Sequence, residues 1–429
     1  MNEIVTLWID WLRPSIGLVT VQWALVLATA AMAGSLLQRA TGLPKVVGYA
    51  LTGSAAGFAG FGGAAWPLSG TELFLLELGI AVVLFEAGGR IPLRWFRYNP
   101  MVLLQSIAES ALTYLAVDAA LGWLGVRPTV AVPLALVAVA ASPAVLARVA
   151  ADARASGPVT DRALVLATLS TLYALAIGTA HAELQAREQL QLLATAGPAA
   201  LVLGLSVGVG AVLALVLRLA LRFMSPSSEN TSILLLALIA AAAGIASHLG
   251  GSAPLAALLG GMLLKQFHAR PWAWPRQLGT AASLLTMLMF VLVSVVAAQA
   301  DWTAPVAGLV LVLVGVRLLA KVGGVTLANV RSGTSARQAL WIGCAMAPMS
   351  SIALLIASQY AQAPGAAARQ IASIALPAIL LMELLGAVVA TVALYRAGEA
   401  SRAWRPRRRG LPALPGDAPG TGEGDGHGA

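Results

Sequence analysis

The segment Val137-Ala-Val-Ala-Ala-Ser142-Pro143-Ala-Val-Leu146 interrupts a long apolar run with a serine and a proline. A second segment, Gly343-Cys-Ala-Met-Ala-Pro348-Met-Ser350-Ser351-Ile352, does the same in the other half of the chain. Proline lacks the amide donor that an α-helix needs and clashes with the preceding turn. In lipid such a break is unfavourable unless protein or water covers the freed backbone groups. A matched pair of interrupted spans is typical of the binding site of a secondary transporter.

The composition excludes an ordinary soluble domain. Of 429 residues, 59% are hydrophobic and 10% are charged, and the mean hydropathy is +0.83, whereas soluble domains carry roughly one-quarter charged residues. Met1–Gly17 carries Glu3 and Asp10 and has no basic start, so we expect no cleavable signal peptide. The single cysteine, Cys344, lies in an apolar run, so we expect no intrachain disulfide.

The charge pattern indicates a membrane topology. The apolar runs have the roughly 17–25-residue length that a membrane span requires. With an outside N-terminus, most basic loop residues fall on the inner side, and the outer side keeps only Arg13, Arg127, Arg187 and Arg369. The positive-inside rule therefore favours an N-out, C-in arrangement, and it assigns the net charge of +9 to cytoplasmic loops rather than to nucleic-acid binding. We predict thirteen spans, at about 18–38, 44–62, 71–89, 99–125, 129–150, 160–181, 191–217, 229–250, 253–267, 276–298, 303–330, 337–360 and 367–395.

Five stretches, taken in order, resemble motifs of one transporter family. They are Leu43–Gly53, Glu77–Gly88, Leu249–Leu264, Lys321–Gly324 with Gly333–Gly343, and Glu383–Ala387. Together they are similar to the monovalent cation:proton antiporter superfamily, the membrane domain of Kef-type and NhaP-like sodium/hydrogen exchangers, over roughly residues 20–395. The closing motif departs from the family because Ala387 stands where proline is usual.

The resemblance implies an all-α polytopic fold with inverted repeats, in which the helices form two domains with different roles. Helices at about 99–181 and 303–395 would form a transport domain, and those at about 18–89 and 191–298 a dimerisation scaffold. Residues 18–395 would thus be the membrane domain, preceded by a periplasmic segment, 1–17, and followed by a basic, then disordered cytoplasmic tail, 396–429.

The resemblance also implies a mode of action. Two unwound helices would cross near the midplane and bring Ser142 and Pro143 beside Pro348 and Ser350. The implied partners are a monovalent cation (Na⁺ or K⁺), protons, the lipid bilayer and a second copy of the chain, in a bacterial inner membrane. The sequence contains no nucleotide-binding loop or metal-ligand cluster, so we expect no cofactor, no metal and no enzymatic activity.

The acidic residues on which the family's chemistry rests are missing. By this resemblance, the family's Asn-Asp or Gln-Asp pair, in the span after the first broken helix, falls on Ser170 and Thr171 to within one residue, and the stretch from Arg162 to His181 contains no Asp or Glu. Ser142 occupies the acid position of the first break, and the charged pair after the second break is replaced by Met349 and Ser351. A hydroxyl does not titrate near neutral pH. Ser170 and Thr171 could supply cation ligands or simply serve as helix-packing contacts.

Four charged residues remain within the predicted spans near this site: Glu109, Asp118, Arg317 and Lys321. A charge in the membrane costs roughly 2.5–3.5 kcal/mol even on the insertion scale, so these side chains need partners or water. Our hypothesis is that Glu109 is the titratable group and Arg317 its counter-charge. The alternatives are a structural ion pair or a protonated Glu109 in a helix interface.

Two functional hypotheses follow. In the first, the chain exchanges a monovalent cation for protons by alternating access. In the second, it is a transport-silent or repurposed relative, working as a scaffold, a sensor or a carrier of a different solute. The missing acids favour the second hypothesis, and the retained breaks favour the first. The remaining acids at family positions, Glu77, Glu86 and Glu383, are interpreted as structural.

Overall fold

The computed structural model describes residues 16–61, 64–91, 93–186, 195–225, 228–267, 276–300, 302–330, 332–349, 351–362 and 365–401. Throughout these residues the chain is helical, apart from turns and a single isolated bridge between Ala155 and Ala400. Three predicted features fall outside the described residues: most of the N-terminal segment, most of the tail, and Ser350.

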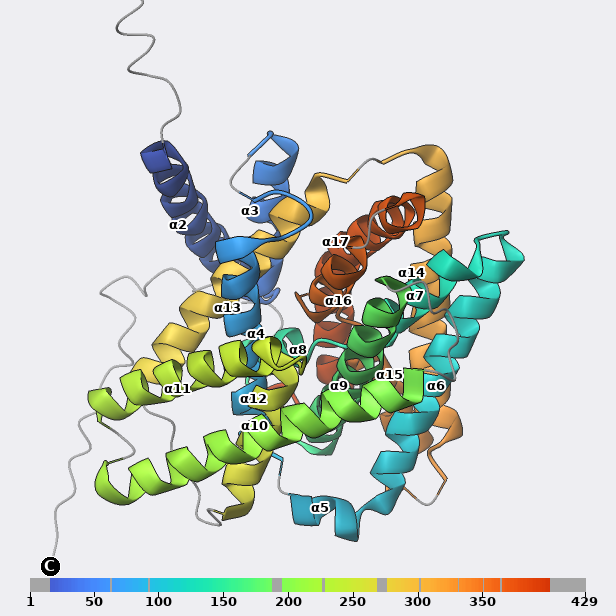
Figure 1. Cartoon of the computed structure of the whole chain (residues 1–429). Coiled ribbons are helices and arrows are strands. Elements are labelled where there is room, and N and C mark those ends of the chain that lie inside the picture. Colours follow the sequence, from blue (N-terminus) through green and yellow to red (C-terminus); the bar gives the residue numbers. More distant parts are fainter. Residues whose placement is uncertain are drawn as a thin grey trace, which may run out of the picture.

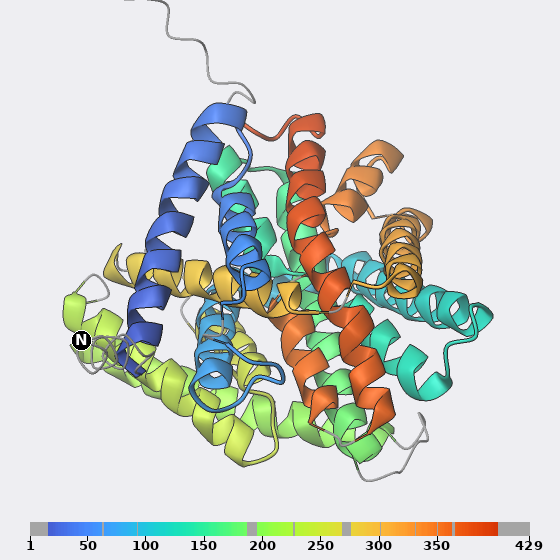
Figure 2. The same ribbon diagram turned by 90° about the horizontal axis from the view of Figure 1, so that it is seen from above.

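The helices form two laterally adjacent groups (Figures 1 and 2). In the first group α2 packs on α3, α3 on α13, and α12 on both α4 and α10. Its members are α2 (Ile16–Thr41), α3 (Lys45–Phe58), α4 (Gly70–Gly89), α10 (Ala196–Phe223), α11 (Glu229–His248), α12 (Ala253–Phe267) and α13 (Arg276–Ala298). A short helix, α5 (Leu93–Tyr98), follows α4.

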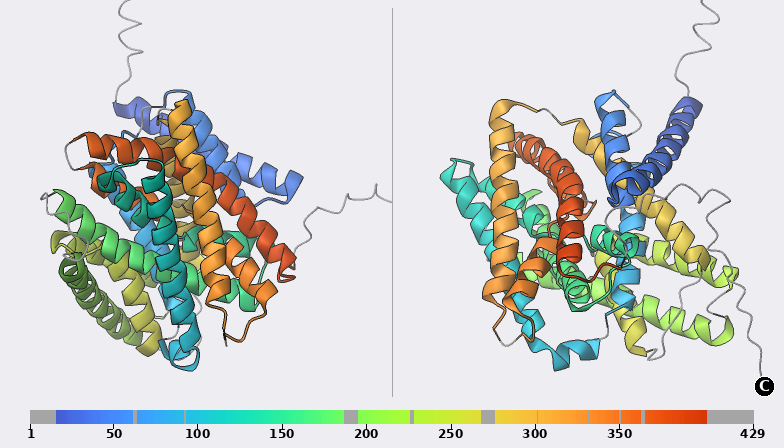
Figure 3. Two further views of the ribbon diagram at one scale, coloured as in Figure 1. Left: turned by 90° about the vertical axis from the view of Figure 1, so that its right-hand side faces the viewer. Right: turned by 180° about the vertical axis from the view of Figure 1, so that it is seen from behind.

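In the second group, α6 lies along α14 (Figure 3), and α9 and α17 contact both broken helices. Its members are α6 (Pro100–Trp123), α7 (Pro128–Val139), α8 (Pro143–Ala153), α9 (Pro158–Ala186), α14 (Ala304–Leu327), α15 (Ala336–Ala345), α16 (Ser351–Ala361) and α17 (Ala366–Arg396). The two groups meet where α17 packs on α13 and α3, and where α4 contacts α8, α9 and α16.

The helix bounds agree with the predicted spans. Each of the thirteen predicted ranges contains one helix or a pair of half-helices. Among the described residues, eight helical segments are long and apolar enough to cross a membrane, one of which is α7 and α8 taken together. The two ranges with a serine–proline break are the ones that split, into α7 and α8 and into α15 and α16. The all-α membrane fold is thereby confirmed, while the number of crossings and the orientation remain predictions.

Both breaks follow from local sequence. The first half-helix ends at Val139, and the backbone of Ala140 and Ser142 is extended. Ser142 then caps α8, with its Oγ accepting from the Val145 amide at 3.3 Å, and Pro143 occupies the first turn, where its missing N–H costs nothing. In the second break Pro348 lies in a non-helical stretch. The Ser142 amide donates to the Pro348 carbonyl at 3.0 Å, so the two breaks touch.

Two glycines bring neighbouring helices close to this crossing. A Cβ on Gly324 of α14 would lie 2.4 Å from the Cα of Glu109, and a Cβ on Gly386 of α17 would lie 2.7 Å from the Cα of Pro348. Small residues allow such close approach between membrane helices. The first contact sets α14 directly against α6 at the depth of Glu109, and the second seats α17 on the second break.

Candidate ion site at the helix crossing

Arg317 of α14 binds the carbonyl ends of both broken helices. Its Nε donates to Ala138 O at 2.9 Å, and its Nη2 donates to Ala140 O at 2.8 Å. From the second break, Ala347 O accepts from Nη1 at 2.6 Å, and Pro348 O accepts from Nη2 at 3.4 Å. The side chain is fully buried. Helix C-termini leave carbonyls without intrahelical partners and carry about −0.5 elementary charge, so this arginine satisfies and neutralises both ends at once.

Lys321 lies one turn further along α14 and joins the first break to Glu109. Its Nζ donates to Val139 O at 2.9 Å and forms an ion pair with Oε1 of Glu109. The carboxylate also accepts from Thr113 Oγ1 at 3.3 Å and from Ser110 Oγ at 3.2 Å. Both charged side chains are fully buried. The α6–α14 interface therefore holds an ion pair that is hydrogen-bonded to the first break.

The prediction that Arg317 is the ion-pair partner of Glu109 is wrong. Lys321 is the residue that pairs with Glu109, and Arg317 is committed to four carbonyl oxygens. The physical reason is the shape of the two cations. A guanidinium is a rigid fork with five donors that suits several acceptors, whereas an ammonium acts as a compact point charge.

The other side of the crossing carries hydroxyl groups. Thr171 Oγ1 of α9 donates to Ala141 O at 2.7 Å, which ties α9 to the first break. Ser170 Oγ donates within its own helix, to Ala167 O at 3.2 Å. Ser351 Oγ, at the start of α16, is buried without a partner. Ser142, Pro143, Thr171, Pro348 and Ser351 thus belong to the breaks or touch them.

Asp118 does not join this cluster. It is half-buried on α6, and none of the hydrogen bonds or ion pairs recorded among the described residues connects it to the crossing. Of the four predicted charged candidates, Glu109, Arg317 and Lys321 therefore meet at one place. The carbonyls of Ala138 to Ala141 are the part that sequence reasoning missed, because backbone acceptors leave no residue-type signal beyond the break itself.

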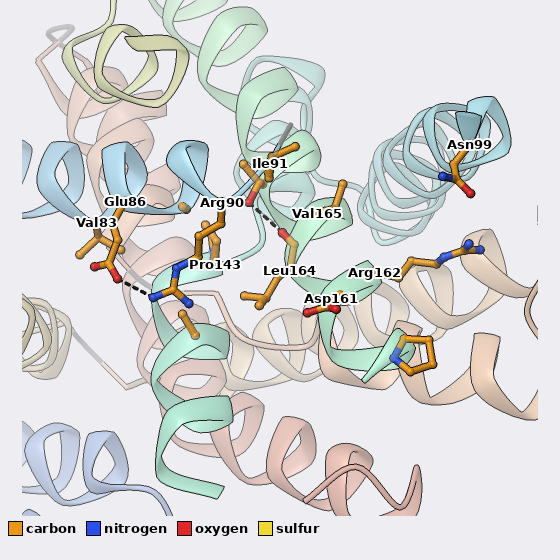
Figure 4. A pocket seen from close by; sticks show the side chains of 14 residues that line it. Val83, Glu86, Arg90, Ile91, Asn99, Pro143, Asp161, Arg162, Leu164 and Val165 are labelled. Carbon is orange, nitrogen blue, oxygen red and sulfur yellow. Dashed lines mark hydrogen bonds and ion pairs between the residues drawn. The ribbon is translucent and has the colours of Figure 1, made fainter. Parts of the chain in front are cut away.

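Two cavities open at opposite ends of α4 and α9. The first, the Arg162 cavity, has a volume of about 510 Å³ and reaches Pro143 at the start of α8. Figure 4 shows the Glu86–Arg90 ion pair of α4 on one side of it and Asp161 and Arg162 of α9 on the other. Acidic and basic side chains are therefore balanced in this cavity.

The second, the Glu77 cavity, has a volume of about 410 Å³. It lies at the other ends of α4 and α9, against α12 and α16, and Glu77 and Glu183 line it. Along α9 the two linings are separated by the stretch between Thr168 and Thr179, which spans about 16 Å at 1.5 Å per residue. That stretch contains Ser170 and Thr171, so the crossing lies between the two cavities.

A bundle with two broken helices that meet at a buried charge cluster defines a class, the polytopic transporters built around discontinuous helices. The chain belongs to the sodium/hydrogen exchanger family, because the family model described as "Sodium/hydrogen exchanger, transmembrane" matches residues 26–394. The family is one of transporters rather than enzymes. The predicted resemblance is thereby confirmed. Among curated proteins, none matches the sequence.

Solved structures share the fold. The sodium proton antiporter MjNhaP1 from Methanocaldococcus jannaschii at pH 8 is 14% identical, with a TM-score of 0.64 over 89% of this chain and 98% of that chain. An electron-microscopy structure of the same antiporter is 16% identical, with a TM-score of 0.56 over 94% of this chain and 96% of that chain. At these identities the likeness concerns the fold.

Proposed function

We propose that this chain is a secondary transporter that exchanges a monovalent cation, Na⁺ or K⁺, for protons by alternating access. Family membership supports the class of transport. The observation that carries the proposal is the Glu109–Lys321 ion pair, which is fully buried and hydrogen-bonded to the first break. It supplies a carboxylate and an ammonium group beside the crossing, even though, by the resemblance, the family's Asn-Asp or Gln-Asp pair falls on Ser170 and Thr171.

The chemistry of exchange follows from charge balance at this pair. A cation that binds the Glu109 carboxylate displaces the Lys321 ammonium from it. Burial penalises an unpaired charge, so the displaced lysine releases its proton. One cation then enters for each proton released, and reprotonation of Lys321 expels the cation. The hydroxyl oxygens of Ser110 and Thr113, which hydrogen-bond the same carboxylate, complete the coordination of the dehydrated ion.

The two cavities fit the access that this exchange requires. Neither lining, as far as the structure describes it, includes Glu109 or Lys321. A third cavity, of about 310 Å³ between α6, α7 and α9, reaches Ser110 and Val139, which contact the pair. In the N-out orientation the Arg162 cavity faces the cytoplasm and the Glu77 cavity faces the outside. Every helix end that lines a given cavity then lies on the same side of the membrane.

The helix groups suggest how access alternates. The second group, residues 99–181 and 303–395, acts as the transport domain and slides against the first group, 18–89 and 191–298, which forms the scaffold and the homodimer contact. Residues 18–395 constitute this membrane domain, between a periplasmic segment, 1–17, and a cytoplasmic tail, 396–429. The site of action is a bacterial inner membrane.

Proton exchange in proteoliposomes tests the proposal. We expect addition of Na⁺ or K⁺ to collapse an imposed pH gradient between about pH 6 and 9, and we expect Glu109→Gln to lose this response. Asp118→Asn, which changes an acid on the same helix away from the crossing, is the matched control and keeps the response. Folding of each variant is checked by gel filtration.

Two results would contradict the proposal. A wild-type protein that gives no response to Na⁺, K⁺ or Li⁺ excludes monovalent cation:proton exchange. A full response in Glu109→Gln excludes the Glu109–Lys321 pair as the exchanging group while leaving exchange itself standing.

A second candidate function rests on the charge at the crossing. Arg317, Lys321 and Glu109 together carry a net positive charge, and α9 presents hydroxyls rather than carboxylates there. A transport-silent relative, or a carrier of a different solute, is compatible with that arrangement. The same proteoliposomes decide between the two, because this alternative predicts no cation-driven proton flux.

A further inference from the structure

A buried carboxyl group lies at the contact between the two helix groups. Glu383 of α17 is 2% exposed. Its Oε2 accepts a hydrogen bond from Ser294 Oγ of α13 at 3.0 Å, and its Oε1 has no partner among the described residues. Ser294 is fully buried and belongs to the first helix group, whereas α17 belongs to the second. This hydrogen bond therefore joins the two groups inside the protein.

Glu383 lies deep in the membrane domain, at the level of the helix crossing. It is 13 residues from Arg396 and 17 residues from Ala366, the two ends of α17, which places it about 20 and 26 Å from them along the helix axis. Gly386, one turn further along α17, packs on Pro348 of the second break. The carboxyl group is thus between the second break and the first helix group.

The contact around this carboxyl group is tightly packed. A Cβ on Gly53 of α3 would lie 2.9 Å from Ser294 Cβ, so α3 presses on Ser294 from the side away from α17. The described linings of the three cavities include neither Glu383 nor Ser294. Glu383 is therefore held away from water in this conformation.

In the described structure, no cation is paired with this carboxyl group. Helices α3, α7, α8, α13, α14, α15 and α16 pack on α17. Their charged and titratable residues are Lys45, Tyr49, Arg148, Asp152, Arg276, Arg317, Lys321, Arg337, Cys344 and Tyr360, and α17 itself carries Arg369, Tyr395 and Arg396. None of the hydrogen bonds or ion pairs recorded among the described residues connects any of these to Glu383. The two cations at the crossing are committed elsewhere, Arg317 to carbonyl oxygens and Lys321 to Glu109.

The cost of burial assigns the protonation state of this acid. An ionised carboxylate without a partner is costly in a dry interior within the membrane, and such a group becomes neutral instead. A neutral acid requires only hydrogen-bond partners, and Ser294 provides one. Glu109 differs, because the Lys321 ammonium pairs with it. The two buried acids at this depth are thus expected in opposite states, Glu109 ionised and Glu383 neutral.

We propose that Glu383 is a proton-binding site, separate from Glu109, that holds the two helix groups together. It keeps its proton while α17 packs on α13, and it releases the proton to water when the two helices separate. A rise in pH therefore weakens the contact between the groups. The protonation of Glu383 is independent of the proposed exchange, whereas its link to alternating access rests on that proposed function.

Infrared spectroscopy of the purified protein tests the protonation directly, because a protonated carboxyl group has a C=O stretch that a carboxylate lacks. We expect this band at neutral pH in the wild type and in Glu109→Gln, and we expect Glu383→Gln to lose the intensity of one carboxyl group. Glu229→Gln changes an exposed acid in the first turn of α11 and is the matched control, which should keep the full band. A band of equal intensity in Glu383→Gln and the wild type would overturn the inference.

The pH dependence of unfolding measures the same proton by its effect on stability. The unfolded chain ionises Glu383 above about pH 4.3, whereas the folded protein keeps the proton, so rising pH favours unfolding. Relative to Glu383→Gln, the wild type should lose about tenfold in its folding equilibrium constant for each pH unit between about pH 5 and 8. Ser294→Ala removes the hydrogen bond but leaves the acid, so it should keep this pH dependence. Parallel pH profiles of the wild type and Glu383→Gln would overturn the inference.

Exchange in proteoliposomes tests the link to alternating access. Glu383→Gln resembles the protonated acid at every pH, so its helix groups should separate less readily and its exchange should be several-fold slower. The ratio of wild-type to variant rates should rise with pH, because only the wild type gains from releasing the proton. A ratio that is constant with pH would overturn the role of Glu383 in holding the groups together. If the wild type shows no exchange, the proposed function fails, and the infrared and unfolding measurements still decide whether Glu383 holds a proton.

Discussion

The two sides of the crossing differ in how their helix ends are neutralised. On the carbonyl side, the basic side chains of Arg317 and Lys321 donate to the carbonyl ends, Arg317 to those of α7 and α15 and Lys321 to that of α7. On the amide side, where α8 and α16 begin with about half a positive charge each, the described structure offers the hydroxyls of Ser142 and Ser351. Thr171 of α9 instead donates to the Ala141 carbonyl within the first break. The comparison indicates that the residues which hold the two breaks together are distinct from the residues which would bind an ion there. In the described residues, one side of the crossing is bound by basic side chains, and the other carries hydroxyls.

The largest expected effect comes from removing Arg317, which holds the carbonyl ends of both broken helices. Arg317→Leu leaves four buried carbonyl contacts without their donor. Each buried acceptor left unsatisfied costs about 1–3 kcal/mol, so the summed loss should exceed that of a single broken ion pair. We expect little folded protein in gel filtration and a strongly lowered free energy of unfolding. Arg317→Lys keeps the positive charge but loses the several donors of the guanidinium group, so its free energy of unfolding should lie between those of Arg317→Leu and the wild type.

The control for this prediction is Arg222→Leu, which removes an exposed arginine at the end of α10 and should leave stability nearly unchanged. Equal stability of Arg317→Leu and the wild type would show that the carbonyl side needs no fixed charge, and the contrast between the two sides would disappear.

A smaller effect is expected from the ion pair on the same side. Glu109→Gln leaves the Lys321 ammonium buried without its partner, and Lys321→Met does the same to the Glu109 carboxylate. Each change should lower the free energy of unfolding by about 3–5 kcal/mol. The double variant removes both charges, so its loss in unfolding free energy should be clearly less than the sum of the single losses. Chemical unfolding in detergent measures this cycle.

If the losses in unfolding free energy add, the two side chains do not interact. Lys321 would then stabilise the fold only through its hydrogen bond to the Val139 carbonyl. The pair Arg39→Met and Glu72→Gln, which the described structure does not bring into contact, provides the additive reference.

The sequence predicted the positions of the helices and their two breaks better than it predicted the ion-pair partner of Glu109. Pro143 and Pro348 lie beside small polar residues, and this combination marks the breaks; a proline alone does not, because Pro377 lies inside the continuous helix α17. The lengths of the apolar runs indicate where the helices lie, so both breaks and the helix ranges could be found without coordinates. The partner of Glu109 could not, because Arg317 and Lys321 are one turn apart on α14 and either could face α6. The choice depends on backbone carbonyls of Ala138 to Ala140, which tertiary packing alone places within reach.

The Glu77 cavity shows a second limit of sequence reasoning. Glu77 was interpreted as structural because it matches a family position, and its neighbours Thr179, Ser252 and Ser358 are small polar residues of a kind common in membrane helices. Their meeting depends on α4, α9, α12 and α16 ending at one place. No residue spacing along the chain encodes that convergence, so only the packed structure reveals it.

The smallest expected effect concerns the hydroxyl side. Thr171→Val removes the hydrogen bond to Ala141 O and leaves that carbonyl without it, at a cost of about 1–3 kcal/mol in unfolding free energy. Thr168→Val, one turn earlier on α9, is the matched control. Its Oγ1 donates to Leu164 O within the same helix, where the carbonyl keeps its backbone partner, so Thr168→Val should cost clearly less than Thr171→Val. Equal costs for the two variants would show that Thr171 is a packing contact, and the amide side would then hold no specific polar link between α9 and the first break.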